Sequence, residues 1–186
     1  MVNILICCTG SVATIKIPEI LSNLSQLDNC RVKLIVTEHS RHFLPELCQL
    51  GTPGEDVLCD EDEWRSWRGR GDPVLHIELR NWADLAVIAP LSANSLAKLA
   101  NGLADNLLTC VMRAWDFKKH ALVAPAMNTM MWEHPVTSQH LAILRDWGYS
   151  VIPPCSKTLG ERQSNSKAAE IEFLNQLVQK LAHLSV

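Results

Sequence analysis

Five continuous apolar runs of strand length recur along the chain, and helix-like stretches separate them. Because the runs do not alternate with polar residues, the predicted strands must be covered on both faces. Strands of this kind, connected by helices, form a parallel sheet with right-handed crossovers. We therefore expect a doubly wound, three-layer α/β fold with helices on both faces of a parallel sheet. The predicted strands are Val2–Cys8, Arg31–Thr37, Leu85–Ala89, Ala121–Ala126 and Tyr149–Ile152, and the predicted helices include Val12–Leu24, Ser95–Ala104 and Asn106–Ala114.

The length of 186 residues suits a single domain with one core, so we take residues 1–186 as one domain. Gly51–Asp72 interrupts the strand–helix alternation with Pro53, four glycines, an acidic run and two tryptophans. We expect this stretch to be an excursion on the surface. Lys167–Leu184 has amphipathic spacing and predicts a terminal helix that packs on the core.

The composition excludes several classes of partner. The chain is 47% hydrophobic and 20% charged with a formal charge of -3, which gives no electrostatic footprint for nucleic acid or an anionic membrane. Seven cysteines without CxxC spacing indicate a reducing compartment and no structural metal. The opening residues lack a basic region and are shorter than the about 20 apolar residues of a membrane span. We expect a cytoplasmic protein.

Small polar residues follow four of the predicted strands. These segments are Thr9–Ala13, Thr37–Ser40, Pro90–Ser95 and Pro125–Trp132. In an open parallel sheet, ligands bind at the carboxyl ends of the strands. A glycine turn before a helix suits an anion such as phosphate, but the chain has neither the three-glycine dinucleotide fingerprint nor the Walker lysine. Tight turns and helix caps explain the same residues equally well. The pattern alone predicts a phosphorylated, planar or small ligand.

His76 is the candidate base. It lies in Asp72–Leu79, which we expect to be a short extended stretch before the next strand. A neutral imidazole accepts a proton near physiological pH, although a lone histidine is more often a structural, hydrogen-bonded residue.

Taken together, four segments resemble the homo-oligomeric flavin-containing cysteine decarboxylases, over about Asn3 to Pro154. The segments are Gly10–Ala13, Pro90–Ser95, Gly102–Leu108 and Pro125–Trp132. The nearest similarity is to the phosphopantothenoylcysteine decarboxylases of coenzyme A synthesis, which carry stretches similar to Asp60–Trp64, Asp72–Ile77 and Asp105–Cys110. The peptidyl-cysteine decarboxylases of modified-peptide biosynthesis resemble the chain more distantly.

The resemblance implies a flavodoxin-like fold, an FMN cofactor and a homotrimer or a multiple of trimers, with FMN near a subunit interface. It implies that His76 is the active-site base and that Asn128 binds the substrate carboxylate, since an amide donates to an oxyanion without adding charge. Met127 would line the flavin. The remaining implied FMN contacts are Gly10, Ser11, Val12, Ser40 and Phe43, with Ser92, Ala93, Asn94 and Ser95 on the phosphate side.

The chain departs from the coenzyme A enzymes at two places. Those enzymes resemble one another in a second arginine, where this chain has Asn81 after Arg80. They also carry a late clamp with a Cys-Gly pair, which Cys155–Ser166 lacks. Both departures favour, as first hypothesis, oxidative decarboxylation of the C-terminal cysteine of a peptide to an aminoenethiol. Glu161 and Arg162 would then form part of a recast substrate clamp.

Two alternatives stay open at this stage. One is a phosphopantothenoylcysteine decarboxylase with an unusual clamp, acting on a small pantothenoylcysteine-like substrate. The other is a catalytically silent FMN-binding subunit that regulates a partner protein. The presence of both His76 and Asn128 argues against a silent subunit.

Overall fold

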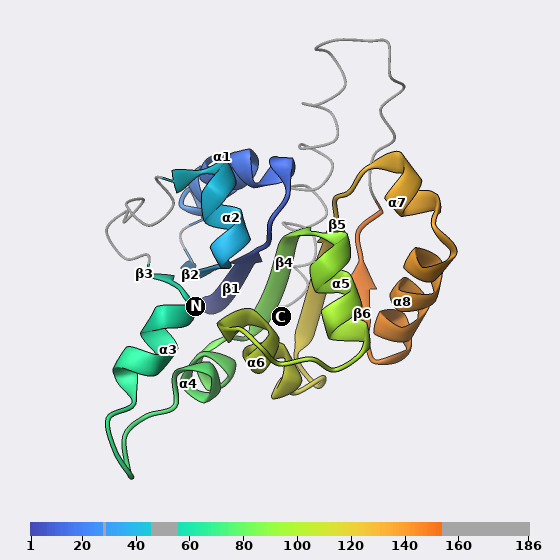
Figure 1. Ribbon diagram of the computed structural model, residues 1–186. Coiled ribbons are helices and arrows are strands. Elements are labelled where there is room, and N and C mark those ends of the chain that lie inside the picture. Colours follow the sequence, from blue (N-terminus) through green and yellow to red (C-terminus); the bar gives the residue numbers. More distant parts are fainter. Residues whose placement is uncertain (28, 46–55, 154–186) are drawn as a thin grey trace.

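A computed structural model describes residues 1–27, 29–45 and 56–153 (Figure 1). Its centre is a six-stranded sheet in the order β3-β2-β1-β4-β5-β6, and every neighbouring pair of strands is parallel. This confirms the predicted α/β fold. The strands are β1 (Val2–Cys8), β2 (Cys30–Val36), β3 (Asp56–Leu58), β4 (Leu85–Leu91), β5 (His120–Pro125) and β6 (Tyr149–Val151).

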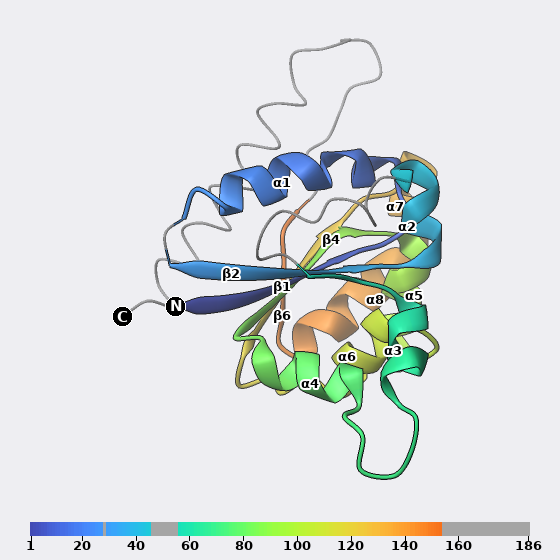
Figure 2. The ribbon, with the colours of Figure 1, turned by 90° about the vertical axis from the view of Figure 1, so that its left-hand side faces the viewer.

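Helices cover both faces of the sheet, as Figure 2 shows from the side. The 3₁₀ helix η1 (Val12–Lys16) and α1 (Ile17–Leu24) lie on one face. The opposite face carries α4 (Leu75–Trp82), α5 (Ala93–Ala100), α6 (Leu107–Arg113) and α8 (Pro135–Asp146). The remaining short helices are α2 (Glu38–Phe43), α3 (Asp60–Ser66) and α7 (Thr129–Glu133).

Alternate residues of each central strand enter different cores. In β1, Ile4 and Ile6 are fully buried and pack with the apolar side of α1. Leu5 and Cys7 are equally buried in the other core, which α4, α5, α6 and α8 complete. Two buried layers on one sheet explain why the strand sequences are continuously apolar.

The described part of Gly51–Asp72 lies at the surface as predicted, since no residue of α3 is buried, but it does not interrupt the strand–helix alternation. Asp56–Leu58 pairs with β2 as an edge strand, and Asp60–Ser66 is a helix. A strand of three residues is too short to show a period in the sequence. Its pairing with β2, which is distant along the chain, defines it.

The predicted extended stretch around His76 is also wrong. These residues form helix α4, whose Leu79 is buried in the core shared with α6. The alternation of Leu75 and Ile77 imitates a strand, but tertiary packing selects the helix.

Helix boundaries differ slightly from the predictions. The predicted helix Val12–Leu24 is divided into η1 and α1, with Pro18 in the first turn of α1. Proline lacks the N–H that a continuous helix would require there. α5 ends at Ala100 with Asn101 as its C-cap, because Gly102 then adopts a positive φ of 70°.

Some predictions fall outside the described residues: those for Cys155, Glu161 and Arg162 and for the terminal helix Lys167–Leu184. Within residues 1–27, 29–45 and 56–153, no helix combines the length and apolarity needed to cross a membrane.

Candidate functional site

The four polar loops meet at the carboxyl edge of the sheet, and Thr9 joins two of them. Its hydroxyl is fully buried and donates to the carbonyl oxygen of Pro90 at 2.8 Å. The hydroxyl oxygen of Thr9 in turn accepts the backbone N–H of Ser92 at 2.8 Å. The loop after β1 is therefore fastened to the loop after β4, at the point where the strand order reverses.

Further bonds bring in the loops after β5 and β2. The Ser11 hydroxyl caps η1 by accepting the N–H of Ala13, and lies 3.4 Å from the carbonyl oxygen of Ala126, to which it donates. On the other side, the Thr37 hydroxyl donates to the carbonyl oxygen of Cys8 at 3.2 Å. The convergence of the four loops is thus built from small hydroxyl side chains.

Gly10 allows the β1 loop to approach α2 closely. A Cβ atom built on Gly10 would lie 2.6 Å from the Cβ of His39, which is too short for any real contact. This glycine is therefore required for packing of the β1 loop against α2, whatever it contacts in a ligand.

The start of α5 presents backbone donors at this edge. Ser92 is the N-cap and accepts the N–H of Ser95 at 3.2 Å. The N–H groups of Ala93 and Asn94 belong to the first turn and have no acceptor within the helix. Ser95 is buried, whereas Asn94 is exposed. The predicted phosphate segment thus combines a helix cap with donors available to an anion.

The other predicted flavin contacts differ in exposure. Val12 is 67% exposed on η1. Ser40 is fully buried, and its hydroxyl donates to the carbonyl oxygen of Thr37 at 2.6 Å. Phe43 is partly buried at the end of α2, and Met127 is partly buried against the core. Val12 therefore faces outward, while Ser40 shapes its own loop.

Asn128 is exposed and caps α7. Its Oδ1 accepts the N–H of Met130 at 2.8 Å. Because capping uses the amide oxygen, the orientation of the amide is fixed and the Nδ2 group is left as a donor. The exposed end of Asn128 is suited to bind an oxyanion.

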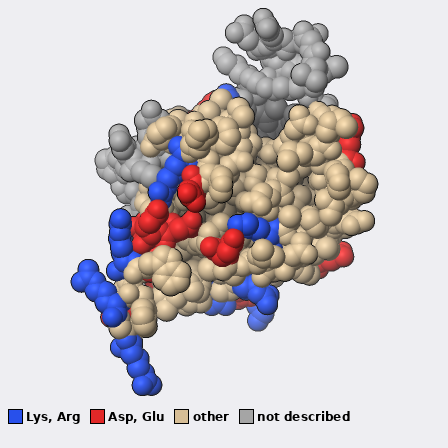
Figure 3. All heavy atoms as spheres, in the orientation of Figure 1, with Lys and Arg blue, Asp and Glu red and all other residues tan. Residues whose placement is uncertain are grey.

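His76 is held by a residue that the sequence reasoning missed. The carboxylate of Glu63 lies 2.7 Å from the Nδ1 of His76 through Oε1, and its Oε2 accepts the backbone N–H of His76 at 3.0 Å. Glu63 belongs to the acidic run in α3, and its signals in the sequence were that run and the family resemblance of Asp60–Trp64, neither of which pointed to a contact with His76. Figure 3 shows the acidic side chains gathered over this region, while much of the same face is uncharged.

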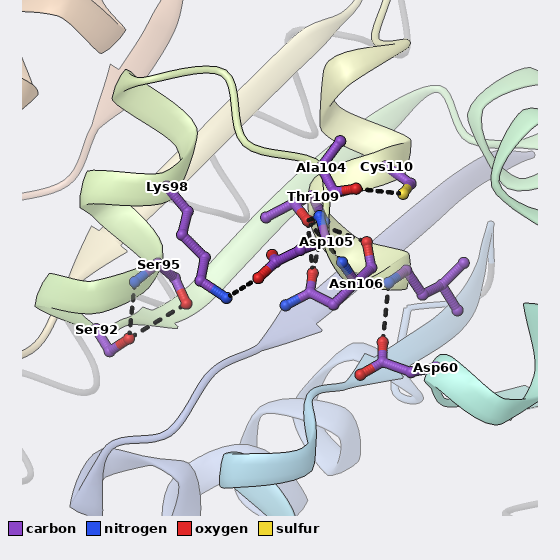
Figure 4. Close-up of polar contacts among 10 residues, drawn as sticks. Asp60, Ser92, Ser95, Lys98, Ala104, Asp105, Asn106, Thr109 and Cys110 are labelled. Carbon is purple, nitrogen blue, oxygen red and sulfur yellow. Dashed lines mark hydrogen bonds and ion pairs between the residues drawn. The ribbon is translucent and has the colours of Figure 1, made fainter.

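The neighbouring cysteine stays protonated. Burial raises the pKa of Cys110, and the carboxylates of Glu63, Asp105 and Asp60 add to the effect. Its thiol donates to the carbonyl oxygen of Ala104 (Figure 4). Cys110 is therefore a thiol beside acids, not an activated nucleophile.

The segment around Asp105 has a structural role. The Lys98 ammonium lies 2.6 Å from the Asp105 carboxylate, and Asn106 caps α6 by accepting the N–H of Thr109 (Figure 4). Asp60 of α3 accepts the N–H of Leu107 at 2.8 Å, and burial is the main cause that raises its pKa. These contacts fix the start of α6 to α5 on one side and to α3 on the other.

Within one chain, His76 and Asn128 do not come together. Figures 1 and 2 both show α4 and α7 well apart, with α4 toward the β3 side below the sheet and α7 beyond β5 at the carboxyl edge. No hydrogen bond joins the two side chains in the part of the chain that the structure describes.

The chain is similar to known cysteine decarboxylases. It is 47% identical over 182 residues to phosphopantothenoylcysteine decarboxylase of Mus musculus, covering 95% of this chain and 85% of the relative. A solved mutant PPC decarboxylase, complexed with pantothenoylaminoethenethiol, is 50% identical with a TM-score of 0.80, covering 86% of this chain and 85% of that one. The FMN-dependent cysteine decarboxylase TvaF from thioviridamide biosynthesis is 28% identical with a TM-score of 0.74, covering 83% and 91%.

The profile described as Flavoprotein matches residues 1–184, which is nearly the whole chain. Together with the parallel sheet and its convergent loops, this match shows that the chain belongs to the Flavoprotein family.

Proposed function

We propose that the chain is an FMN-dependent decarboxylase and that its substrate is phosphopantothenoylcysteine. The observation that carries the choice of substrate is the 47% identity to the mouse enzyme of that name, which extends over 95% of this chain. The peptide substrate, favoured by the sequence departures, therefore takes second place.

The residues at the carboxyl edge fit FMN. The cofactor combines a phosphate dianion, a polar ribityl chain and a planar apolar ring. The N–H groups of Ala93 and Asn94 suit the phosphate, and hydroxyls such as that of Ser11 suit the polar chain. Val12 offers exposed apolar surface to the ring, with Gly10, Ser40, Phe43, Ser92, Ser95 and Met127 completing the predicted set. When bound, FMN supplies the electron acceptor that protein side chains lack.

Two side chains carry the remaining chemistry in this proposal. The Nε2 of His76 takes the proton from the substrate thiol, which leaves a thiolate. The Nδ2 of Asn128 donates to the substrate carboxylate and orients it. With an electron acceptor bound there, removal of two electrons from the cysteine would let the bond between its α-carbon and its carboxylate break and release carbon dioxide. Return of those two electrons, with a proton, would then give the saturated thiol.

We propose further that the active assembly is a homotrimer or a multiple of trimers in the cytoplasm, with FMN near a subunit interface. The separation of α4 from α7 in one chain supports this arrangement, because a site that uses both His76 and Asn128 would then need one of the two residues from a neighbouring copy. Light scattering of the flavin-loaded protein measures the assembly, and a monomer that turns over substrate would contradict it.

A peptide with a C-terminal cysteine is the second candidate substrate. The observation in its favour is the absence of a Cys-Gly pair from Cys155–Ser166, a segment that lies outside the described residues. The similarity to TvaF, at 28% identity, is weaker than that to the pantothenoyl enzymes.

Incubation of the purified protein with each substrate, followed by mass spectrometry, tests the function. Phosphopantothenoylcysteine is expected to lose about 44 mass units as carbon dioxide and give a saturated thiol. A loss of about 46 units on a peptide, for carbon dioxide plus two hydrogens, would instead favour the second candidate. Protein that binds FMN but turns over neither substrate would contradict both candidates and favour the silent FMN-binding subunit. Protein that stays colourless in excess FMN would contradict all three.

Asn128→Asp tests the carboxylate contact. Aspartate preserves the N-cap of α7 but replaces the donor by a negative charge, so the fold should persist while kcat/KM falls about 10²- to 10³-fold. Asn29→Asp makes the same charge change at an exposed turn far from the site and should retain activity. If both variants had the same kcat/KM, Asn128 would not be the residue that binds the substrate carboxylate.

A further inference from the structure

We propose that Glu63 is a positioning residue for His76: it fixes the imidazole in the Nδ1–H tautomer, so that Nε2 is free to take the proton of the substrate thiol. This inference rests on the proposed function of His76. It assigns a defined chemical task to an acidic residue that the sequence presents as part of a surface run.

The geometry requires a specific placement of the proton. An ionised carboxylate has acceptors and no donor, so an imidazole nitrogen 2.7 Å from Oε1 of Glu63 must carry the hydrogen. That nitrogen is Nδ1 of His76. Nε2 makes no hydrogen bond within the described residues, and in the neutral ring it holds the lone pair.

The second oxygen of the same carboxylate prevents rearrangement. Oε2 of Glu63 accepts the backbone N–H of His76 at 3.0 Å, so one carboxylate binds both the ring and the main chain of the same residue. The side chains are 14% exposed for Glu63 and 25% exposed for His76. Rotation of the ring would break a partly buried, charge-assisted bond, which favours one orientation.

Helix α3 is itself anchored so that Glu63 stays in place. Asp60 and Glu63 are three residues apart and therefore share one side of α3. Asp60 accepts the N–H of Leu107 at the start of α6, and Glu63 accepts that of His76 at the start of α4. Carboxylates at helix amino termini are favourable, so both contacts hold α3 against the core helices.

The tautomer of the wild-type protein is the first test. Long-range ¹H–¹⁵N correlation of histidine-labelled, FMN-loaded protein distinguishes a protonated ring nitrogen from an unprotonated one, and His76→Asn identifies the signals among those of the seven histidines. We expect Nδ1 protonated and Nε2 unprotonated in the neutral ring. The opposite assignment overturns the proposal, and this test needs no variant of Glu63.

Glu63→Gln is the second test. The glutamine oxygen can satisfy the backbone N–H of His76, but its NH₂ group then faces Nδ1 and selects the Nε2–H tautomer. We expect kcat to fall about 10²- to 10⁴-fold, as for loss of the base, with KM nearly unchanged. The double variant with His76→Asn should be no slower than His76→Asn alone, because both changes disable one unit.

Glu61→Gln is the matched control. Glu61 lies on the same helix, but its carboxylate is bound to Arg41 and does not contact His76. It should retain the wild-type tautomer and kcat. If Glu63→Gln behaves like Glu61→Gln in both measurements, the proposal is wrong.

The proposal and the proposed function fail differently. If His76→Asn leaves turnover unchanged, the function assigned to His76 fails, whatever the tautomer. If His76→Asn abolishes turnover and Glu63→Gln does not, only the positioning role fails. Should Glu63→Gln not fold, Glu63→Asp shortens the carboxylate while keeping its charge, and a wild-type kcat in that variant with a lost Nδ1–H signal would contradict the proposal.

Discussion

The carboxyl edge of the sheet and the α3–α4 region position their functional residues by different means. At the edge, buried hydroxyls such as that of Thr9 fasten loops that directly follow core strands. In the α3–α4 region, a carboxylate from one short helix caps the next and holds His76. The first arrangement follows from strand order, whereas the second depends on side chains that meet only after folding.

Gly10→Ala should have the largest effect on stability, and it acts at the edge alone. The added Cβ would lie 2.6 Å from that of His39, so one loop must move. We expect a loss at the upper end of about 1–3 kcal/mol in the free energy of unfolding by urea, together with weaker FMN binding. Gly69→Ala, where nothing lies within 4 Å, is the control and should show no loss. Equal stability of the two variants would refute the close approach.

Thr9→Val should cause the next largest loss in the free energy of unfolding. Valine keeps the shape but leaves the partly buried N–H of Ser92 without its acceptor, at a cost of about 1–2 kcal/mol. Thr9→Ser retains the hydroxyl and should recover most of the loss. FMN affinity, measured by fluorescence titration, should fall with Val and not with Ser. Unchanged affinity for both would mean that the two loops do not need this link.

Asp60→Ala should weaken the contact between α3 and the start of α6, away from the carboxyl edge. The N–H of Leu107 loses its carboxylate, which should lower the free energy of unfolding by about 1 kcal/mol. FMN affinity should stay constant, because the variant does not touch the carboxyl edge. A loss of flavin as large as that in Thr9→Val would show that the two regions are coupled.

The smallest effect should come from the Arg41–Glu61 pair, which links α2 at the edge to α3. The hydrogen bond from Arg41 lowers the pKa of Glu61 to about 2 from its usual 4.5. Because the pKa of Glu61 is lower in the folded state, its ionised form stabilises the fold at any pH above the pKa of the unfolded state, about 4.5. This stabilisation is lost as the pH falls from 4.5 toward 2. Glu61 is about half exposed, so the contribution should stay below about 1 kcal/mol.

Comparison of wild type with Glu61→Gln measures that contribution. The difference in urea midpoint should be present near neutral pH and shrink as pH falls below about 4. Because the two proteins share every other acidic residue, the decrease in the midpoint difference reports the titration of Glu61 alone. A difference that grows in acid would reverse the sign derived from the Arg41 contact.

The loops at the carboxyl edge of the sheet could be predicted from the sequence better than the surroundings of the candidate base, His76. Thr9–Ala13, Pro90–Ser95 and Pro125–Trp132 could be placed together because each follows a core strand of a parallel sheet. The family resemblance singled out His76, but its local structure was predicted incorrectly and Glu63 was not predicted at all. Neither hydrophobic periodicity nor motif spacing could predict that the carboxylate of Glu63 contacts His76, thirteen residues later on another helix.

By itself, the sequence determined the parallel α/β fold, since continuous apolar runs can be satisfied only by strands buried on both faces. It also determined that polar loops gather at one edge. Only the tertiary structure decided that Gly51–Asp72 contributes an edge strand and α3, that α4 is a helix, and which oxygen of Glu63 meets which nitrogen of His76. Those features rest on pairing and hydrogen bonds between separate elements, whose geometry exists only once the sheet has assembled.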